Sequence, residues 1–92
     1  MEKYSEKDKS IAAFLLICKN LKFQGTQPNG EVLLFLFSPA NEAKRQAELF
    51  YAKQAEPIQP KDYAEAQQTI IDLIWRWRKS KDGGIYYGRQ RY

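Results

Sequence analysis

Cations and aromatic rings alternate at the C-terminal end of the chain, in the last eighteen residues WRWRKSKDGGIYYGRQRY. Arginine and lysine neutralise phosphates, and aromatic rings stack on unpaired bases with about 1–3 kcal/mol per base. A segment that holds both favours RNA or single-stranded DNA, whose bases are open to stacking. The predicted phosphate ligands are Arg76, Arg78, Lys79, Lys81, Arg89 and Arg91, and the predicted stacking rings are Trp75, Tyr86 and Tyr87.

The net charge of the chain is concentrated in this segment. Of the formal +4, residues 75–92 carry six cations and one acid, a net +5, whereas residues 1–74 carry nine cations and ten acids, a net −1. A nearly neutral body with a cationic end is typical of a protein that meets a polyanion through that end.

Residues suited to catalysis are sparse. The chain has no histidine and one cysteine, Cys18, which lies in an apolar stretch where a thiol is usually inert. Asp62 and Glu65 fall near the start of an expected helix, where acids complement the helix dipole. Tyr86 and Tyr87 beside arginines could form a nucleophilic site, but the segment shows no scaffold to fix a phosphate. We expect no enzyme activity, no cofactor and no metal site.

The same rings also have a structural interpretation. Trp75 and Trp77 are two positions apart on an expected helix, so they point about 200° apart. Trp77 continues a core stripe, while Trp75 shares an outer row with Ile71, which is more often a protein interface than a base platform. The tyrosines of GIYYG could instead fold back as an edge strand on the body.

Length and composition predict one small domain. The chain has 92 residues, and we expect residues 1–80 to form a single α+β domain and residues 81–92 a basic, aromatic tail. No stretch reaches the roughly 18 apolar residues of a membrane span, and MEKYSEKDKS lacks the apolar core of a signal peptide. These features, with the single cysteine, predict a cytoplasmic protein without disulfides.

The N-terminal part predicts a helix. The segment from Ser5 to Asp8 has the form of a capping box, which places the helix start at Ser5. Ile11, Phe14 and Cys18 follow at the spacing of one buried helix face, and the helix is expected to end near residues 19–20.

A β-hairpin is expected next. LKFQG and EVLLFLF have strand character and flank a turn at Asn29 and Gly30. Residues 32–37 are apolar at every position, so helices must cover one face of this strand and another body, such as a second protomer, the other face. Leu33 and Phe35 are therefore candidate protein-interface residues, together with Ile71 and Trp75.

Two further helices complete the pattern. Ser38 and Pro39 favour a cap and first helical position, and this helix should end before Pro57. Pro60 is placed to open a third helix, whose apolar period runs from Tyr63 past residue 74 and stops after residue 80. The order helix, strand, strand, helix, helix predicts a two-layer α+β domain with helices on one face of a small antiparallel sheet.

The segments YSEKDKSIAAFLL, EVLLFLFSP and PIQPKDYAEAQQTIIDLIW carry a resemblance to a known family. In these motifs the chain resembles a small family of archaeal, bacterial and viral proteins known as a domain of unknown function. The resemblance covers roughly residues 4–75, with Ser5 at the family's usual threonine cap and Asn20 where a glycine often closes its first helix. It implies the same order of elements and an association with viruses or other mobile elements, and it implies no activity.

The sequence thus favours a non-enzymatic nucleic-acid-binding accessory protein, from a phage or mobile element, acting within a larger nucleoprotein complex. The expected partner is RNA or DNA bound through the C-terminal segment, with no membrane and no small-molecule substrate. The alternative is a protein–protein adaptor, a homodimeric interaction module, or a small inhibitor of a nucleic-acid enzyme.

Overall fold

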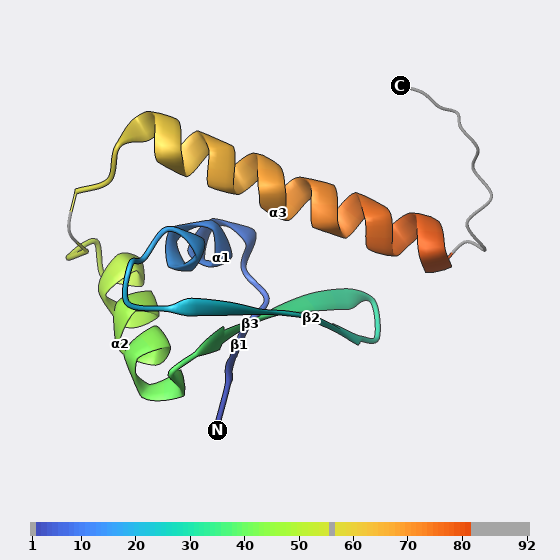
Figure 1. Cartoon of the computed structure of the whole chain (residues 1–92), viewed down its shortest axis with the longest axis horizontal. Helices are drawn as coiled ribbons and strands as arrows, with labels where there is room; N and C mark the ends of the chain where they lie inside the picture. Colours follow the sequence, from blue (N-terminus) through green and yellow to red (C-terminus); the bar gives the residue numbers. More distant parts are fainter. Residues whose placement is uncertain (1, 56, 82–92) are drawn as a thin grey trace.

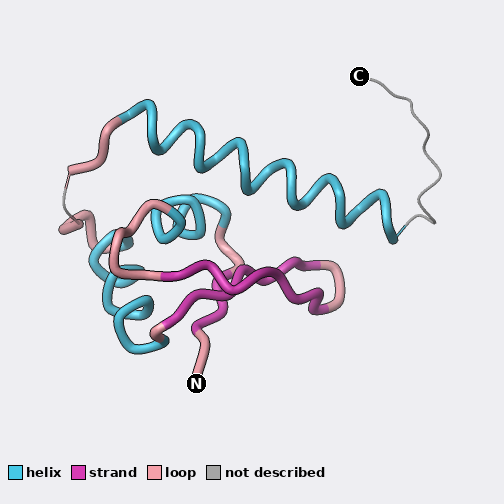
Figure 2. Tube along the Cα trace, in the orientation of Figure 1, coloured by secondary structure: helices cyan, strands magenta, loops and turns pink. Residues whose placement is uncertain are grey.

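A computed structural model describes residues 2–55 and 57–81 of the chain as a mixed α+β fold (Figures 1 and 2). Among these residues, no helix combines the length and the apolar character that crossing a lipid bilayer requires. The elements in chain order are β1 (Tyr4–Glu6), α1 (Lys9–Leu16), β2 (Lys22–Asn29), β3 (Val32–Ser38), α2 (Ala40–Tyr51) and α3 (Pro60–Lys81).

The sheet has three antiparallel strands in the order β1-β3-β2, so the apolar strand β3 lies in the centre. The two-stranded hairpin was predicted, but the additional strand β1 was not. Tyr4 pairs with Phe37 and Glu6 with Phe35, so β1 lies along the second edge of β3 over residues 35–37. An isolated hairpin is marginally stable, and the third strand supplies the missing support.

The start of α1 differs from the predicted capping box. Ser5 lies inside β1, and the N-cap is Asp8, whose Oδ1 accepts hydrogen bonds from the backbone N–H groups of Ser10 at 2.8 Å and Ile11 at 3.1 Å. Glu6 is buried instead of capping, and its carboxylate accepts hydrogen bonds from the Tyr4 hydroxyl and the Asp8 N–H. Ser5 and Glu6, which were expected to cap the helix, therefore belong to β1. The helix begins at Lys9, later than predicted.

The end of α1 also differs from the prediction. The helix ends at Leu16, and the chain then turns through residues 17–21 to enter β2. Among the described residues other than glycine, the positive backbone φ lies at Lys53 and not at Asn20, so Asn20 does not end the helix in the left-handed conformation that was expected.

The hairpin turn lies one residue beyond the predicted position. Asn29 pairs with Val32, which leaves Gly30 and Glu31 as the two-residue loop, and Gly30 takes a φ of 65° that favours glycine. Gly25 was expected beside the turn but lies within β2, with φ at 102°, where the register shifts between Phe23 and Gly25. This is a β-bulge, a feature that often carries a glycine.

The core lies between the sheet and the helices. Figure 1 shows α1 and α3 on the same side of the sheet, and the buried side chains of α1 include Phe14 and Leu15. Phe14 stacks on Phe50 of α2 with ring centroids 4.7 Å apart, and Phe50 in turn contacts the Tyr63 ring of α3 at 6.1 Å. Alanines where the helices meet let the backbones approach closely, and the buried ones are Ala12, Ala13, Ala43, Ala47 and Ala66.

The two C-terminal helices follow the predicted order. The start of α2 lies one residue later than predicted, because Ser38 belongs to β3 and Pro39, the expected first helical residue, is the N-cap. The helix ends before Pro57 as expected. Pro60 opens α3 as predicted. At 1.5 Å per residue the 22 residues of α3 span about 33 Å, and its C-terminal half extends past α1 over the hairpin (Figure 1).

Candidate nucleic-acid interface

The last turns of α3 present an exposed face that carries a ring and cations. Ile71, Trp75 and Arg78 are spaced at i, i+4 and i+7, so they form one row along the helix. Trp75 is 58% exposed and Ile71 41% exposed, and Arg76 and Arg78 are both exposed. Arg76 lies about 100° around the helix from Trp75, on the side of that ring away from Arg78. We call the four residues Ile71, Trp75, Arg76 and Arg78 the α3 outer face.

Packing on the opposite side of α3 fixes the direction of this face. Ala66 and Ile70 are fully or nearly fully buried, and Trp77 is half-buried against the core cluster. Trp77 points about 200° away from Trp75. The two tryptophans therefore lie in different environments, as their spacing predicts, and the exposed ring of Trp75 is held outward by the buried side of its own helix.

The cations of the α3 outer face are available for a ligand. Within the part of the chain that the structure describes, neither Arg76 nor Arg78 forms an ion pair or a side-chain hydrogen bond. The nearest acid on this helix, Asp72, accepts a hydrogen bond from the Gln68 side chain at 3.0 Å. Positive side chains at the C-terminal end of a helix also lie favourably in its dipole field.

Lys79 is half-buried at this end of α3. Lys81 is the last residue of the helix. The other predicted contacts, Tyr86, Tyr87, Arg89 and Arg91, lie outside the described residues, as do the possible edge strand GIYYG and the predicted tail.

The prediction that Leu33 and Phe35 lie at a protein interface is wrong, because both are buried in the core. Leu33 is 5% exposed and Phe35 0%, because both point toward the helices and form part of the core. Side chains alternate along a strand, so the opposite face of β3 carries Val32, Leu34 and Leu36 instead. Val32 is 40% exposed and the two leucines are half-buried, so this face of the sheet, the β3 outer face, is apolar and open in part.

Tyr4 and Cys18 have partners within the fold. Burial, then the hydrogen bond and the charge of Glu6, raise the pKa of Tyr4 from 10.0 to about 12. Cys18 is half-buried just past α1, and its thiol donates to the Phe14 carbonyl oxygen at 3.5 Å. Over residues 2–55 and 57–81, no group of three or more acidic, cysteine or histidine side chains is placed to hold a metal ion.

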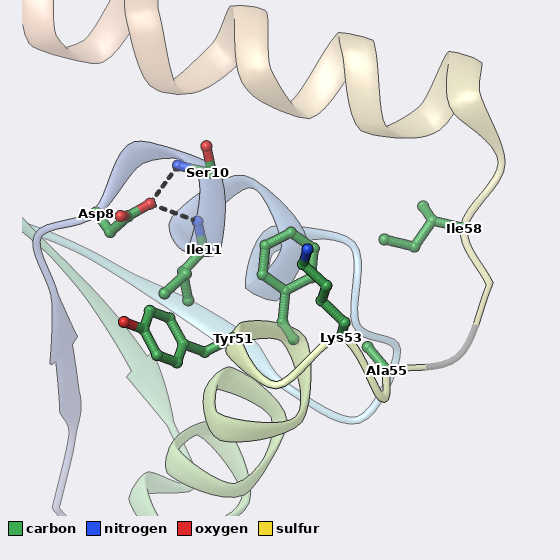
Figure 3. Close-up of a pocket in the computed structure, with 8 residues that line it drawn as sticks. Asp8, Ser10, Ile11, Tyr51, Lys53, Ala55 and Ile58 are labelled. Carbon is green, nitrogen blue, oxygen red and sulfur yellow. Dashed lines mark hydrogen bonds between the residues drawn. The ribbon is translucent and has the colours of Figure 1, made fainter.

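A pocket at the other end of the molecule carries no signal in the sequence. It is formed where α2 ends beside the start of α1, and Lys53 and Ile58 contribute to its wall (Figure 3). Lys53 lies just after α2 with a φ of 63°, a conformation normally adopted by glycine or asparagine at a helix end. Because neither residue type occurs at that position, nothing in the residue pattern predicts the change of chain direction that forms the pocket.

Comparisons of the chain with protein-family models, with curated proteins and with solved structures find no match. The resemblance of residues 4–75 to a domain of unknown function stays a prediction. The functional assignment therefore depends on the geometry and chemistry of the residues described above.

Proposed function

We propose that the chain is a non-enzymatic accessory protein that binds single-stranded nucleic acid through the α3 outer face and the C-terminal segment. The observation that supports this function is the exposed ring of Trp75 beside Arg76 and Arg78, two arginines without an anionic partner among the described residues. The ring stacks on an unpaired base, and the guanidinium groups hold phosphates on either side.

Single strands fit this surface better than duplexes. A tryptophan on a helix surface can stack on a base only where the base face is free, and duplex bases present their faces to one another. Both arginines lie within one turn of Trp75 and on opposite sides of its ring around the helix, so one phosphate on each side of a stacked base can be contacted. RNA and single-stranded DNA both satisfy this chemistry.

The function is tested by fluorescence anisotropy with labelled single-stranded RNA, single-stranded DNA and duplex DNA of equal length. We compare the full chain with Trp75→Ala and with the double variant Arg76→Gln/Arg78→Gln. The matched control is Lys44→Gln/Arg45→Gln, which removes two exposed cations from α2. This control keeps the same net charge as the α3 double variant.

The expected result is tighter binding to single strands than to the duplex, with affinity lost in both α3 variants and retained in the control. Trp75→Ala should lower affinity by about 5-fold to 150-fold, the equivalent of one stacking contact. Equal losses in the α3 and α2 double variants would mean that net charge alone drives binding, and would reject the α3 outer face as the site.

A second candidate function is protein association through the β3 outer face. Both sheet edges are poor templates for a further strand: β1 has three residues and turns Glu6 inward, and β2 contains Pro28 and the bulge at Gly25. A partner or a second copy would therefore dock on the open face around Val32. Val32→Lys should then dissociate the complex in size-exclusion chromatography with light scattering, and association should be nearly independent of salt.

A further inference from the structure

The pocket at the end of α2 has the size and lining of a ligand site. Its volume is about 480 Å³, inside the range of roughly 300–1,000 Å³ that is common for small-molecule sites. The α1 wall includes Ile11, the α2 wall Phe50 and Tyr51, and the chain leading to α3 adds Ala55 and Ile58 (Figure 3). The lining is therefore predominantly apolar.

The apolar wall is held in place by the core. Phe50 lies between two rings. Its ring centroid is 4.7 Å from that of Phe14, on which it stacks, and 6.1 Å from that of Tyr63. The Tyr63 hydroxyl donates a hydrogen bond to the backbone carbonyl of Ser10 at 3.1 Å, which ties α3 to the start of α1 beside the pocket. A wall built this way exists before a ligand arrives, so little of the binding free energy is spent on ordering it.

Lys53 supplies a positive charge at this pocket. Its backbone is anchored by hydrogen bonds from the Lys53 N–H to the Phe50 carbonyl at 3.0 Å and from the Gln54 N–H to the Leu49 carbonyl at 2.7 Å. Its φ of 63° is unfavourable for a side chain of this kind, and such conformations often mark functional positions. In the described ranges 2–55 and 57–81, its ammonium group has no anionic partner.

Asp8 also lines the pocket but its charge is already compensated. One oxygen of its carboxylate accepts two backbone N–H groups at the start of α1, where the helix dipole stabilises a negative charge. Among the described residues that line the pocket, Lys53 is therefore the charge without a partner, and an anionic group is its complement.

We infer that this pocket binds a small carboxylic acid with an apolar tail. The tail lies against Ile11, Phe50 and Ile58, and the carboxylate pairs with the Lys53 ammonium group. A fatty acid and an N-acylated apolar amino acid both combine a carboxylate with an apolar tail, so both classes are tested. This site is independent of the nucleic-acid interface, which lies near the opposite end of α3 (Figure 1).

The experiment is a titration of the isotope-labelled full chain followed by two-dimensional amide NMR. The probes are octanoate and N-acetyl-leucine, and the matched uncharged probes are octanamide and N-acetyl-leucinamide. The expected result is saturable shifts of the Ile11, Lys53, Ala55 and Ile58 amides with at least one acid. The matched uncharged probe of that acid should bind about 10-fold more weakly, because it cannot form the charge-assisted hydrogen bond with Lys53. Which acid binds tells whether the tail is aliphatic or amino-acyl.

Lys53→Asn separates the role of the charge from that of the fold. Asparagine tolerates the left-handed conformation, so this variant should keep the wild-type amide spectrum outside the pocket while acid and amide bind equally weakly. Lys44→Gln, on the exposed side of α2, is the control and should bind as the wild type does. Shifts that do not saturate with either acid, equal affinity of acid and amide for the wild type, or an unchanged preference in Lys53→Asn would each overturn the proposal.

Discussion

Trp75 and Trp77 are two positions apart on α3, and their environments predict opposite consequences of the same substitution. Trp75→Ala removes an exposed ring, so the free energy of unfolding should change by no more than about 0.5 kcal/mol, while nucleic-acid affinity falls. Trp77→Ala removes core contacts and should cost roughly 1–3 kcal/mol in stability. Urea denaturation of both variants, with anisotropy for binding, measures the two effects. A large stability loss in Trp75→Ala would show that its ring packs in the fold.

Tyr4 predicts a dependence of stability on alkaline pH. Its pKa rises to about 12 in the folded protein, chiefly because of burial and then because its hydroxyl donates to Glu6. The folded state thus holds this proton more tightly than the unfolded state. The contribution to stability is complete below the unfolded pKa of 10.0 and is lost as the pH rises toward 12.

Comparison of the urea midpoints of the wild type and Tyr4→Phe across this pH window isolates the contribution of Tyr4. The wild type should lose more stability than Tyr4→Phe does. Tyr51→Phe, at a tyrosine that is 81% exposed, should follow the wild type. Parallel curves for the wild type and Tyr4→Phe would contradict the assigned environment of Tyr4.

At the scale of the element, the start of α1 distinguishes two capping residues. Asp8→Ala should destabilise the protein by about 1 kcal/mol, because two backbone N–H groups lose their acceptor. Ser5→Ala should have a much smaller effect, since Ser5 is exposed and lies in β1. Thermal unfolding of the two variants measures this difference, and a reversed order would restore the capping box that the sequence predicted.

The hairpin offers a second test at this scale, because its two glycines need positive φ angles of different size. Gly25→Ala should cost about 1–2 kcal/mol: no atom within 4 Å would obstruct the new Cβ, so the cost comes from the backbone φ of 102° alone. Gly30→Asn should be nearly neutral, because asparagine tolerates a φ of 65°. Equal unfolding free energies for Gly25→Ala and the wild type would contradict the bulge geometry.

The elements that could be predicted are those with a long repeat or a strong breaker. The period of α3 and the proline at its start identified that helix, and the apolar run identified β3. The strand β1 was missed because three residues are too short for an alternating pattern, and because Ser5 and Glu6 also fit a helix cap. Because β1 was missed, the sequence did not reveal that β3 has a strand on each side and lies in the centre of the sheet.

The candidate site was predictable to the same partial extent. Residue types alone identified Trp75, Arg76 and Arg78, because stacking and phosphate contact need those side chains whatever the fold. An all-apolar strand does not reveal which alternate residues face the core. Leu33 and Phe35 were therefore predicted as interface residues, although the outward face of β3 carries Val32, Leu34 and Leu36. The pocket at Lys53 depends on one backbone conformation without a sequence signature.

At the scale of the whole molecule, α3 separates the two proposed sites. Ile58 of the pocket lies just before α3, and Arg78 lies near its end, about 27 Å from the start of the helix at 1.5 Å per residue. Sites this far apart without shared contacts respond independently to substitution. Lys53→Asn should therefore leave the affinity for single-stranded nucleic acid unchanged, and Trp75→Ala should leave carboxylate binding unchanged, in the anisotropy and NMR titrations described above.

The central claim, that a cationic and aromatic end binds a polyanion, is tested most directly by the salt dependence of single-strand affinity. With about five phosphates neutralised, log affinity against log salt should have a slope near −3.5, and Arg76→Gln/Arg78→Gln should reduce its magnitude by about 1.4. Lys44→Gln/Arg45→Gln should leave the slope unchanged. A slope near zero for the wild type, or the same slope in the α3 double variant, would contradict the claim.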